Sequence, residues 1–108
     1  MKILLVLATL LLVVIIVDVA DAQEWRPCGA GSSYNPHRLI PQGWKGADFR
    51  SACAKHDKHY REQSVTRAQA DSEFLQDMLS QSKYSKRPEQ AKRVARFMYR
   101  AVRRFGRY

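Results

Sequence analysis

The chain has 108 residues, with 19 Lys and Arg against 10 Asp and Glu, so its formal net charge is +9 at pH 7. This length has room for one domain and excludes a multidomain enzyme. The apolar residues are unevenly distributed, because residues 3–17 form one unbroken run of apolar or small side chains.

The apolar run has the features of a secretory signal peptide. Lys2 precedes it, and the Ala-Asp-Ala sequence at 20–22 fits the small-x-small pattern that signal peptidase reads. We therefore expect a signal peptide over 1–22 and a secreted domain over 23–108. A retained membrane anchor is the weaker interpretation, because Asp18 ends the run before the roughly 20 apolar residues that a spanning helix needs.

The mature domain is strongly cationic. Cleavage after Ala22 leaves 18 basic and 8 acidic side chains on 86 residues, a charge of +10. Such a field attracts anionic membrane surfaces, nucleic acids and acidic polymers, and export makes nucleic acid the least suitable of the three. The charge alone does not choose between the other two.

Two cysteines, Cys28 and Cys53, are expected to stabilise this small domain. A chain of this size buries little apolar surface, and a pair of cysteines in an exported protein is most simply one disulfide. Closing a loop of about 25 residues would stabilise the fold by roughly 3 kcal/mol in the chain-entropy model.

A long ordered loop is predicted over 23–46, where three prolines and four glycines occur with no sustained period. A first helix is predicted from Ala47 to Glu62 or Gln63, with Asp48 capping its first turn. Its inward face is spaced at i, i+3, i+4, i+7 and i+11 and consists of Phe49, Ala52, Cys53, His56 and Tyr60.

A second helix is predicted from Thr66, its N-cap, to about Ser82, because Gln69 follows the threonine at capping-box spacing. Asp71 lies in the middle of its apolar face and is expected to point inward. The short connection before Thr66 predicts that the first two helices are antiparallel.

A third helix is predicted from Pro88 to Phe105, with Gly106 as its C-terminal cap. Its arginines are expected to face outward, opposite one buried stripe of Val94, Phe97, Met98, Ala101, Val102 and Phe105. No strand pattern is present. The predicted fold class is therefore all-α, a small disulfide-stapled helical domain with two antiparallel core helices, a third basic amphipathic helix and a long N-terminal metal-binding loop.

The inward histidine, His56, needs a hydrogen-bonding partner, and Asp71 is the obvious candidate. An uncompensated carboxylate is costly in a small core, so Asp71 should bond to His56, to the Tyr60 hydroxyl, or to both. A histidine held by a carboxylate through one nitrogen presents the other as a general base. A purely structural network has the same spacing, and spacing alone favours that interpretation.

A calcium site is suggested by Asp57, which lies about 100° around the helix from His56. If Cys28 is bonded to Cys53, the glycine-containing loop over 27–31 lies beside this helix. Backbone carbonyls and a carboxylate are ligands that Ca²⁺ prefers, and such an ion could polarise an ester carbonyl. Zinc binding by His56 and His59 is less suitable, because no third or fourth ligand is well placed.

Three stretches of the sequence resemble the secreted phospholipase A2 superfamily, particularly its small bacterial and fungal members with few disulfides. They are CGAG at 28–31, FRSACAKHDKHY at 49–60 and ADSEFLQDM at 70–78. Together they cover about half of the mature chain in the expected order. The middle stretch, with its Ala-Cys-x-x-His-Asp-x-x-Tyr pattern, is the specific one.

The resemblance implies a hydrolase of lipid degradation. In that assignment His56 activates the attacking water, Asp71 orients the histidine and Tyr60 supports Asp71. The metal would be Ca²⁺, and its ligands would be the carboxylate of Asp57 and the backbone carbonyls of Pro27, Gly29 and Gly31.

The chain departs from the animal members of this superfamily in three places. His59 stands where they often have a cysteine, and the stretch from Gly31 to His56 is longer than theirs. The short spacing from His56 to Asp71 leaves no room for a β-hairpin between the two helices.

The leading hypothesis is a secreted, monomeric enzyme that hydrolyses a phospholipid acyl ester with Ca²⁺. Its expected partner is a phospholipid membrane surface, anionic in charge, and no nucleic acid is expected. The alternative is a non-catalytic, cationic membrane-binding or toxin-like protein on the same scaffold, which the charge of +10 on 86 residues also fits.

Overall fold

The computed structural model describes residues 25–29 and 40–107, so the predicted signal peptide and Gly31 lie outside the described residues. The described part contains three helices, α2 (Arg50–Glu62), α3 (Arg67–Ser82) and α4 (Pro88–Phe105). It also contains a small antiparallel sheet of β1 (Gly43–Trp44) and β2 (Ala47–Asp48). The prediction of a mainly helical fold is confirmed.

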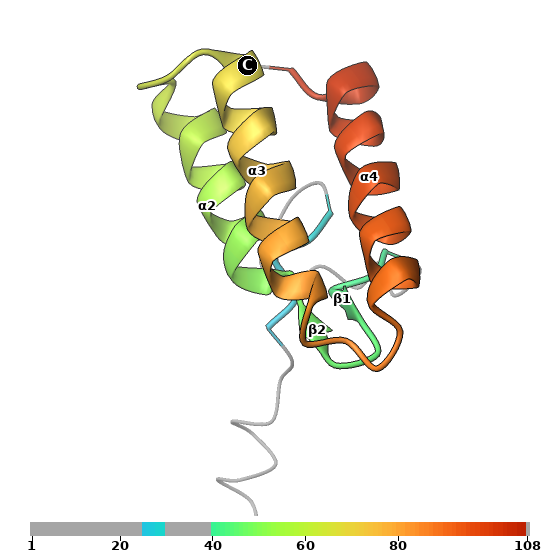
Figure 1. The fold of residues 1–108 in the computed structure, drawn as a ribbon. Helices are drawn as coiled ribbons and strands as arrows, with labels where there is room; N and C mark the ends of the chain where they lie inside the picture. Colours follow the sequence, from blue (N-terminus) through green and yellow to red (C-terminus); the bar gives the residue numbers. More distant parts are fainter. Residues whose placement is uncertain (1–24, 30–39, 108) are drawn as a thin grey trace, which may run out of the picture.

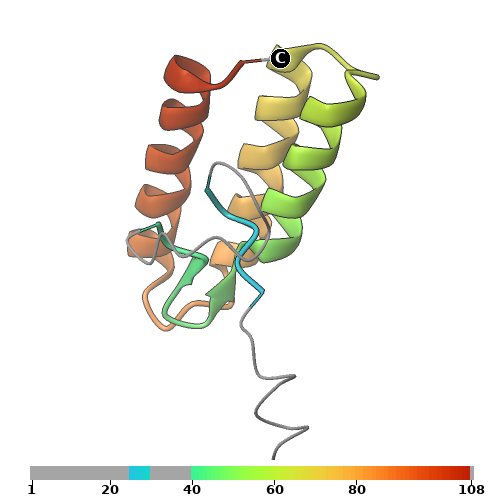
Figure 2. The same cartoon turned by 180° about the vertical axis from the view of Figure 1, so that it is seen from behind.

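The three helices are arranged with α3 in the middle, flanked by α2 and α4 (Figure 1). α2 and α3 run antiparallel, as the short connection between them predicts. Seen from behind, the segment 25–29 crosses in front of the helices (Figure 2). α2 and α4 each pack on α3 and do not pack closely on each other.

The predicted ends of α3 and α4, and the predicted C-terminal end of α2, agree with the structure. The backbone N–H of Gln69 donates to the Thr66 hydroxyl at 3.1 Å, and the Gln69 side chain accepts from the Thr66 N–H at 3.0 Å, which completes the capping box. Asp48 accepts a hydrogen bond from the backbone N–H of Arg50 at 3.0 Å. Pro88 is the first residue of α4, where its missing N–H costs nothing.

The prediction of an all-α domain is wrong at the β1–β2 hairpin. Lys45 and Gly46 both have positive φ, 46° and 101°, which is the geometry of a two-residue hairpin turn. Each strand has only two residues, too few to produce an alternating pattern in the sequence. Because β2 occupies the start of the predicted first helix, α2 begins at Arg50 instead of Ala47.

The core lies where all three helices and the hairpin meet. Phe49 and Met78 are fully buried there, and small side chains at Ala91 and Ala95 let α4 approach the core closely. Ala70 and Phe74 of α3 are also buried. The inner faces predicted for the first two helices are therefore confirmed.

The prediction that the whole apolar stripe of the third helix is buried is wrong. Met98 is buried as expected, but Phe97 is 65% exposed and Phe105 is 74% exposed. Both line an open cavity beside α2 instead of a packed core. The sequence pattern could not show this, because periodicity identifies an apolar face without showing what covers it.

The disulfide between Cys28 and Cys53 is present, as predicted, and it attaches the segment 25–29 to α2. A second attachment comes from Gln42, whose side-chain amide donates to the Cys28 carbonyl and accepts from the Cys28 N–H, both at 2.9 Å. The segment that precedes Gly29 is thus fixed from two directions.

Reduction of the disulfide is expected to lower the free energy of unfolding by about 3 kcal/mol, because the bond closes a long loop in the unfolded chain. Urea denaturation with and without reductant measures this difference. A double variant, Cys28→Ser with Cys53→Ser, should show the lower stability in both buffers. An unchanged midpoint for the reduced wild-type protein would contradict the expectation.

In the part of the chain that the structure describes, no helix has the length and apolar character needed to cross a membrane.

Candidate active site

His56 of α2 and Asp71 of α3 face each other across the interface between these helices. Nε2 of His56 lies 2.7 Å from Oδ1 of Asp71. His56 is 6% exposed and Asp71 is completely buried. A carboxylate only accepts hydrogen bonds, so Nε2 carries the proton and Nδ1 is the acceptor of the neutral ring.

Asp71 has two further partners that fix its position. The Tyr60 hydroxyl donates to Oδ1 at 2.5 Å, and Nη1 of Arg103 donates to Oδ2 at 2.7 Å. Both oxygens of the buried carboxylate are therefore satisfied, by residues from α2 and from α4. The bond from Tyr60 was expected from the sequence, whereas Arg103 was expected to face outward with the other arginines of its helix.

Arg67 connects the first turn of α3 to the last turns of α4. Its Nη2 donates to the backbone carbonyl of Val102 at 2.9 Å, and it also bonds the Arg103 carbonyl. The Val102 carbonyl also accepts from the backbone N–H of Gly106 at 2.8 Å, and carbonyls at the end of a helix attract positive charge. The contact keeps the part of α4 that carries Arg103 next to Asp71.

Burial and hydrogen bonding act in opposite directions on the two groups of the pair. Burial favours the neutral form of His56 and lowers its pKa below the usual value, although the bond to Asp71 opposes this effect. Burial also works against the charge of Asp71, but the hydrogen bonds from His56, Tyr60 and Arg103 outweigh it and lower its pKa. At neutral pH the pair is thus a neutral imidazole beside a carboxylate.

The His56 ring is held between two aromatic side chains. Its centroid lies 4.3 Å from that of Tyr60 and 4.4 Å from that of Phe74, the latter in a stacked arrangement. Burial, followed by the bond to Asp71, raises the pKa of Tyr60 to about 12, so its hydroxyl stays protonated and keeps donating. No residue in the described ranges bonds to Nδ1 of His56, which leaves that nitrogen available to a bound molecule.

Asp57 lines the same cavity as His56. Its carboxylate forms no hydrogen bond or ion pair with another residue in the part of the chain that the structure describes. Burial raises its pKa to about 6, while the nearby charge of Arg61 acts to lower it. A half-buried carboxylate with no compensating donor is a suitable ligand for a hard cation.

Pro27 and Gly29, two of the predicted calcium ligands, also line this cavity, whereas Gly31 lies outside the described residues. Gly29 has φ of 123°, and a Cβ atom there would come within 3.0 Å of the Ile40 side chain. The backbone angle and the close contact both favour glycine at this position. The disulfide and the Gln42 amide hold this segment across from Asp57.

No group of three or more His, Cys, Asp or Glu side chains suited to a metal occurs among residues 25–29 and 40–107. A site made of one carboxylate and backbone carbonyls would not form such a group.

His59 is engaged elsewhere, because its Nε2 lies 2.8 Å from Glu73. The two histidines of α2 thus contact different acidic residues of α3, at Asp71 and at Glu73.

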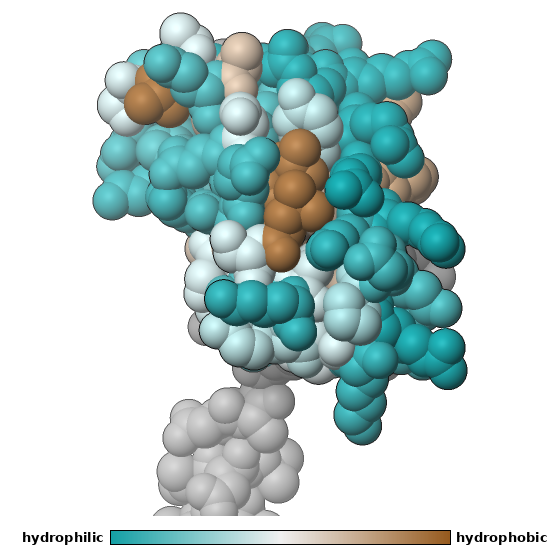
Figure 3. Space-filling view, in the orientation of Figure 1, coloured by the Kyte–Doolittle hydropathy of each residue, from teal (hydrophilic) through white to brown (hydrophobic). Residues whose placement is uncertain are grey.

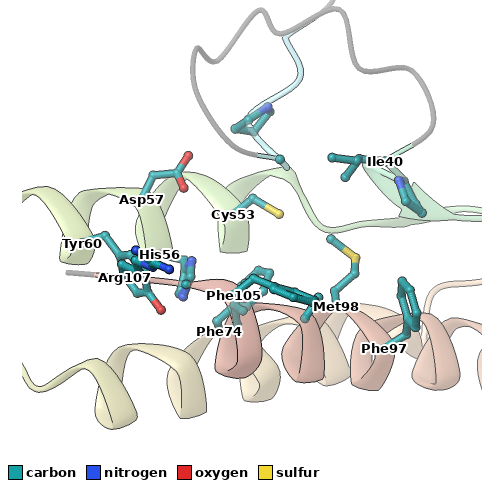
Figure 4. Close-up of a pocket in the computed structure, with 16 residues that line it drawn as sticks. Ile40, Cys53, His56, Asp57, Tyr60, Phe74, Phe97, Met98, Phe105 and Arg107 are labelled. Atoms are coloured by element: carbon teal, nitrogen blue, oxygen red, sulfur yellow. The ribbon is translucent and has the colours of Figure 1, made fainter.

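The cavity has a volume of about 610 Å³ and a mainly apolar lining (Figure 4). His56 and Asp57 lie toward one end and Phe97 toward the other. Phe74 of α3 contributes to the wall between α2 and α4. The remaining lining side chains include Ile40, Pro41, Met98, Ala101, Val102 and Phe105.

Comparisons of the chain with protein-family models, with curated proteins and with solved structures found no match. The geometry of the site is consequently the basis for a functional assignment.

Proposed function

We propose that this protein hydrolyses an acyl ester of a phospholipid, with Ca²⁺ as cofactor and His56 as the general base. The observation that carries the proposal is the buried His56–Asp71 pair, which lies in the wall of an apolar cavity together with Asp57. A structural network would not need an unbonded carboxylate and an open cavity beside the histidine. The resemblance of residues 49–60 to secreted phospholipases A2 supports the same assignment.

In the proposed reaction, water attacks the ester carbonyl carbon while Nδ1 of His56 accepts a proton from the water. Asp71 stabilises the imidazolium that forms, and Tyr60 and Arg103 keep Asp71 in place. The imidazolium then returns the proton to the alkoxide oxygen of the leaving group. The products are a fatty acid and a lysophospholipid, so atoms and charge balance without another reactant.

The residues present fit a calcium ion, with Asp57 as the carboxylate ligand and the carbonyls of Pro27 and Gly29 as further candidates. A bound Ca²⁺ would supply the positive charge that stabilises the oxyanion of the ester. The segment that carries these carbonyls is held in place, because the disulfide and the Gln42 amide fix Cys28, which lies between Pro27 and Gly29 in the chain.

The apolar part of the cavity fits an acyl chain. Phe97 and Phe105 are eight residues apart on α4, which corresponds to about 12 Å along the helix. A hydrocarbon chain with its ester near His56 would lie along this apolar wall. Such a cavity suits a lipid ester better than a polar substrate.

Release of fatty acid from phospholipid vesicles, measured with Ca²⁺ and with a chelator, tests the proposal. Hydrolysis should be observed with Ca²⁺ and should fall to background with the chelator. Equal rates in both buffers would contradict the role of calcium, and no release in either would contradict the enzymatic activity. Vesicle binding without any hydrolysis would favour the alternative, a non-catalytic cationic membrane-binding protein.

Asp57→Asn is expected to make the calcium-free protein more stable at pH 7. The pKa of Asp57 is raised to about 6 in the folded state, so ionisation favours the unfolded chain. That cost is absent below about pH 4, the ordinary range for an aspartate, and complete above pH 6. Thermal denaturation should therefore show a higher midpoint for the variant at pH 7 and nearly equal midpoints at pH 4.

The same experiment tests calcium binding. Added Ca²⁺ should raise the midpoint of the wild-type protein, because a ligand that binds only the folded state stabilises it. The midpoint of Asp57→Asn should not respond. Asp77→Asn is the matched control, since Asp77 contacts Lys55 outside the cavity. A calcium response that persists in Asp57→Asn would show that the ion binds elsewhere.

A further inference from the structure

One stripe of α4 combines positive charge with an exposed aromatic side chain. Arg93, Phe97, Arg100 and Arg104 are spaced at i, i+4, i+7 and i+11, so they lie along one side of the helix. All four are exposed. Phe105, at the end of the same helix, is exposed as well. Phe105 directly follows Arg104 and so lies about 100° around the helix from it, where it lines the cavity. We call the four residues of this side, together with Phe105, the α4 stripe.

The three arginines of the α4 stripe have no acidic partner within salt-bridge distance among the residues that the structure describes. Three acidic side chains of α3 are engaged elsewhere: Glu73 and Asp77 contact Lys55, and Asp71 contacts Arg103. The acidic residue in the first turn of α4, Glu89, contacts Lys92 at 3.1 Å. The stripe therefore presents positive charge that the protein itself does not neutralise.

Hydrophilic side chains dominate the surface over α4 in the view of Figure 3. Phe97 and Phe105 are exposed apolar side chains of this helix, and both also line the apolar cavity. The guanidinium of Arg104 lies 5.5 Å from the centroid of the Phe105 ring. Apolar rings at a cavity mouth, next to unpaired cations, combine the two features that bind a protein to an anionic lipid interface.

We propose that the α4 stripe is the docking surface for an anionic phospholipid leaflet. Phe97 and Phe105 insert at the boundary between head groups and acyl chains, while Arg93, Arg100 and Arg104 bind the phosphates. This orientation places the cavity mouth against the leaflet, so a lipid can enter without crossing water. The last statement rests on the proposed function, whereas the docking itself does not.

The positive charge of the arginines favours an anionic binding partner, and the exposed phenylalanines favour a lipid surface over an acidic polymer. A polyanion such as a polysaccharide would bind the arginines but would gain little from two exposed phenyl rings. Insertion of Phe97 and Phe105 removes their exposed apolar surface from water. Binding to lipid should therefore depend on both residue types, and binding to a polyanion on the arginines alone.

Co-sedimentation with sucrose-loaded vesicles tests the docking surface. The protein carries His56→Gln throughout, so that the lipid stays intact. It should bind equimolar phosphatidylglycerol and phosphatidylcholine vesicles much more tightly than phosphatidylcholine alone, and added salt should weaken this binding. Equal binding to both vesicle types would overturn the proposal.

Arginine removal is tested with the triple variant Arg93→Gln, Arg100→Gln, Arg104→Gln. Its affinity for anionic vesicles should fall about 100-fold, because each basic residue near the surface contributes about 1 kcal/mol, which is about fivefold in affinity. The matched control removes the same charge elsewhere, with Lys58→Gln, Lys83→Gln and Lys86→Gln, which are exposed and outside the cavity lining. An equal loss in both triple variants would mean that only net charge matters and would overturn the proposal.

The phenylalanines are tested with Phe97→Ala and Phe105→Ala. Each should weaken vesicle binding by about tenfold, because burial of a phenyl ring contributes that much or more. Tyr84→Ala is the control, since Tyr84 is 63% exposed, close to the 65% of Phe97, but lies outside the cavity lining. Unchanged binding of both phenylalanine variants, with tight binding to heparin, would identify a polyanion site and overturn the proposal.

Docking and catalysis are separable in these measurements. The arginine triple variant, with His56 restored, should hydrolyse a dispersed short-chain phospholipid at the wild-type rate and lose activity on anionic vesicles. If the vesicle-binding results are as expected but the wild-type protein releases no fatty acid, the docking surface stands and the proposed enzymatic function fails.

Discussion

His56→Gln is expected to reduce phospholipid hydrolysis by about 10²- to 10⁴-fold, the range that a positioned general base contributes. Glutamine retains polar atoms of similar reach but cannot accept a proton at neutral pH. The burial that lowers the pKa of His56 keeps the wild-type imidazole neutral and ready to accept. Initial rates of fatty acid release at saturating Ca²⁺ measure the effect.

His59→Gln provides the matched control on the same helix. His59 lies close to His56 in the chain and likewise bonds to an acidic residue of α3, Glu73, but it does not line the cavity. Its rate should stay near that of the wild-type protein. Full activity in His56→Gln, or an equal loss in both variants, would remove the basis for a catalytic histidine.

Asp71→Asn is expected to lower the free energy of unfolding by about 2 to 3 kcal/mol at pH 7, the range for hydrogen bonds to a buried charged group. The carboxylate accepts from His56, Tyr60 and Arg103, and it is completely buried. Asparagine keeps the shape but loses the charge and replaces one acceptor with a donor. Urea denaturation gives the difference directly.

The difference between the wild-type protein and Asp71→Asn should depend on pH. The pKa of Asp71 is lowered in the folded state, so its contribution is complete above about pH 4, its unfolded pKa. The contribution disappears as the pH falls through the folded pKa. The two stability curves should therefore converge at acid pH, and a constant difference down to the lowest pH would contradict the charged network.

Two further variants separate the burial of the network from its charge. Arg103→Gln should cost less than Asp71→Asn, because the Arg103 side chain is 37% exposed and water can replace it. Asp77→Asn should change stability by about 0.5 kcal/mol or less, since its contact with Lys55 is on the surface. The order of the three losses tests whether burial, rather than the number of ion pairs, determines the stability of this network.

The same helix, α4, contributes to the fold, the candidate site and the proposed docking surface through different sides. Ala91 and Ala95 pack in the core, Arg103 contacts Asp71, and Phe97 faces the cavity. Different sides of this one amphipathic helix therefore contact the core, the buried carboxylate and the cavity. This division explains why some of its apolar residues are exposed even though the helix is part of the core.

The sequence by itself determined the ends of α3 and α4, the disulfide partners and the inward direction of Asp71. These features depend on local rules: Thr66 and Gln69 satisfy the free N–H groups of their own helix, and Asp71 shares a face with Phe74. The His56–Asp71 contact could be predicted as well, because the short connection between α2 and α3 leaves an antiparallel pair as the simple arrangement.

Only the tertiary structure decided which distant residues meet at the site. Arg103 is 32 residues from Asp71, and the Gln42 amide is 14 residues from Cys28, with no pattern in the chain that links either pair. The exposure of Phe97 and Phe105 was likewise undetermined, because their periodicity is the same whether a core or an open cavity lies beside them. The physical reason lies in the packing of whole helices. α4 packs on one side of α3 and α2 on the other, and the space between α2 and α4 depends on how these helices cross. The spacing of residues within one helix does not encode that arrangement.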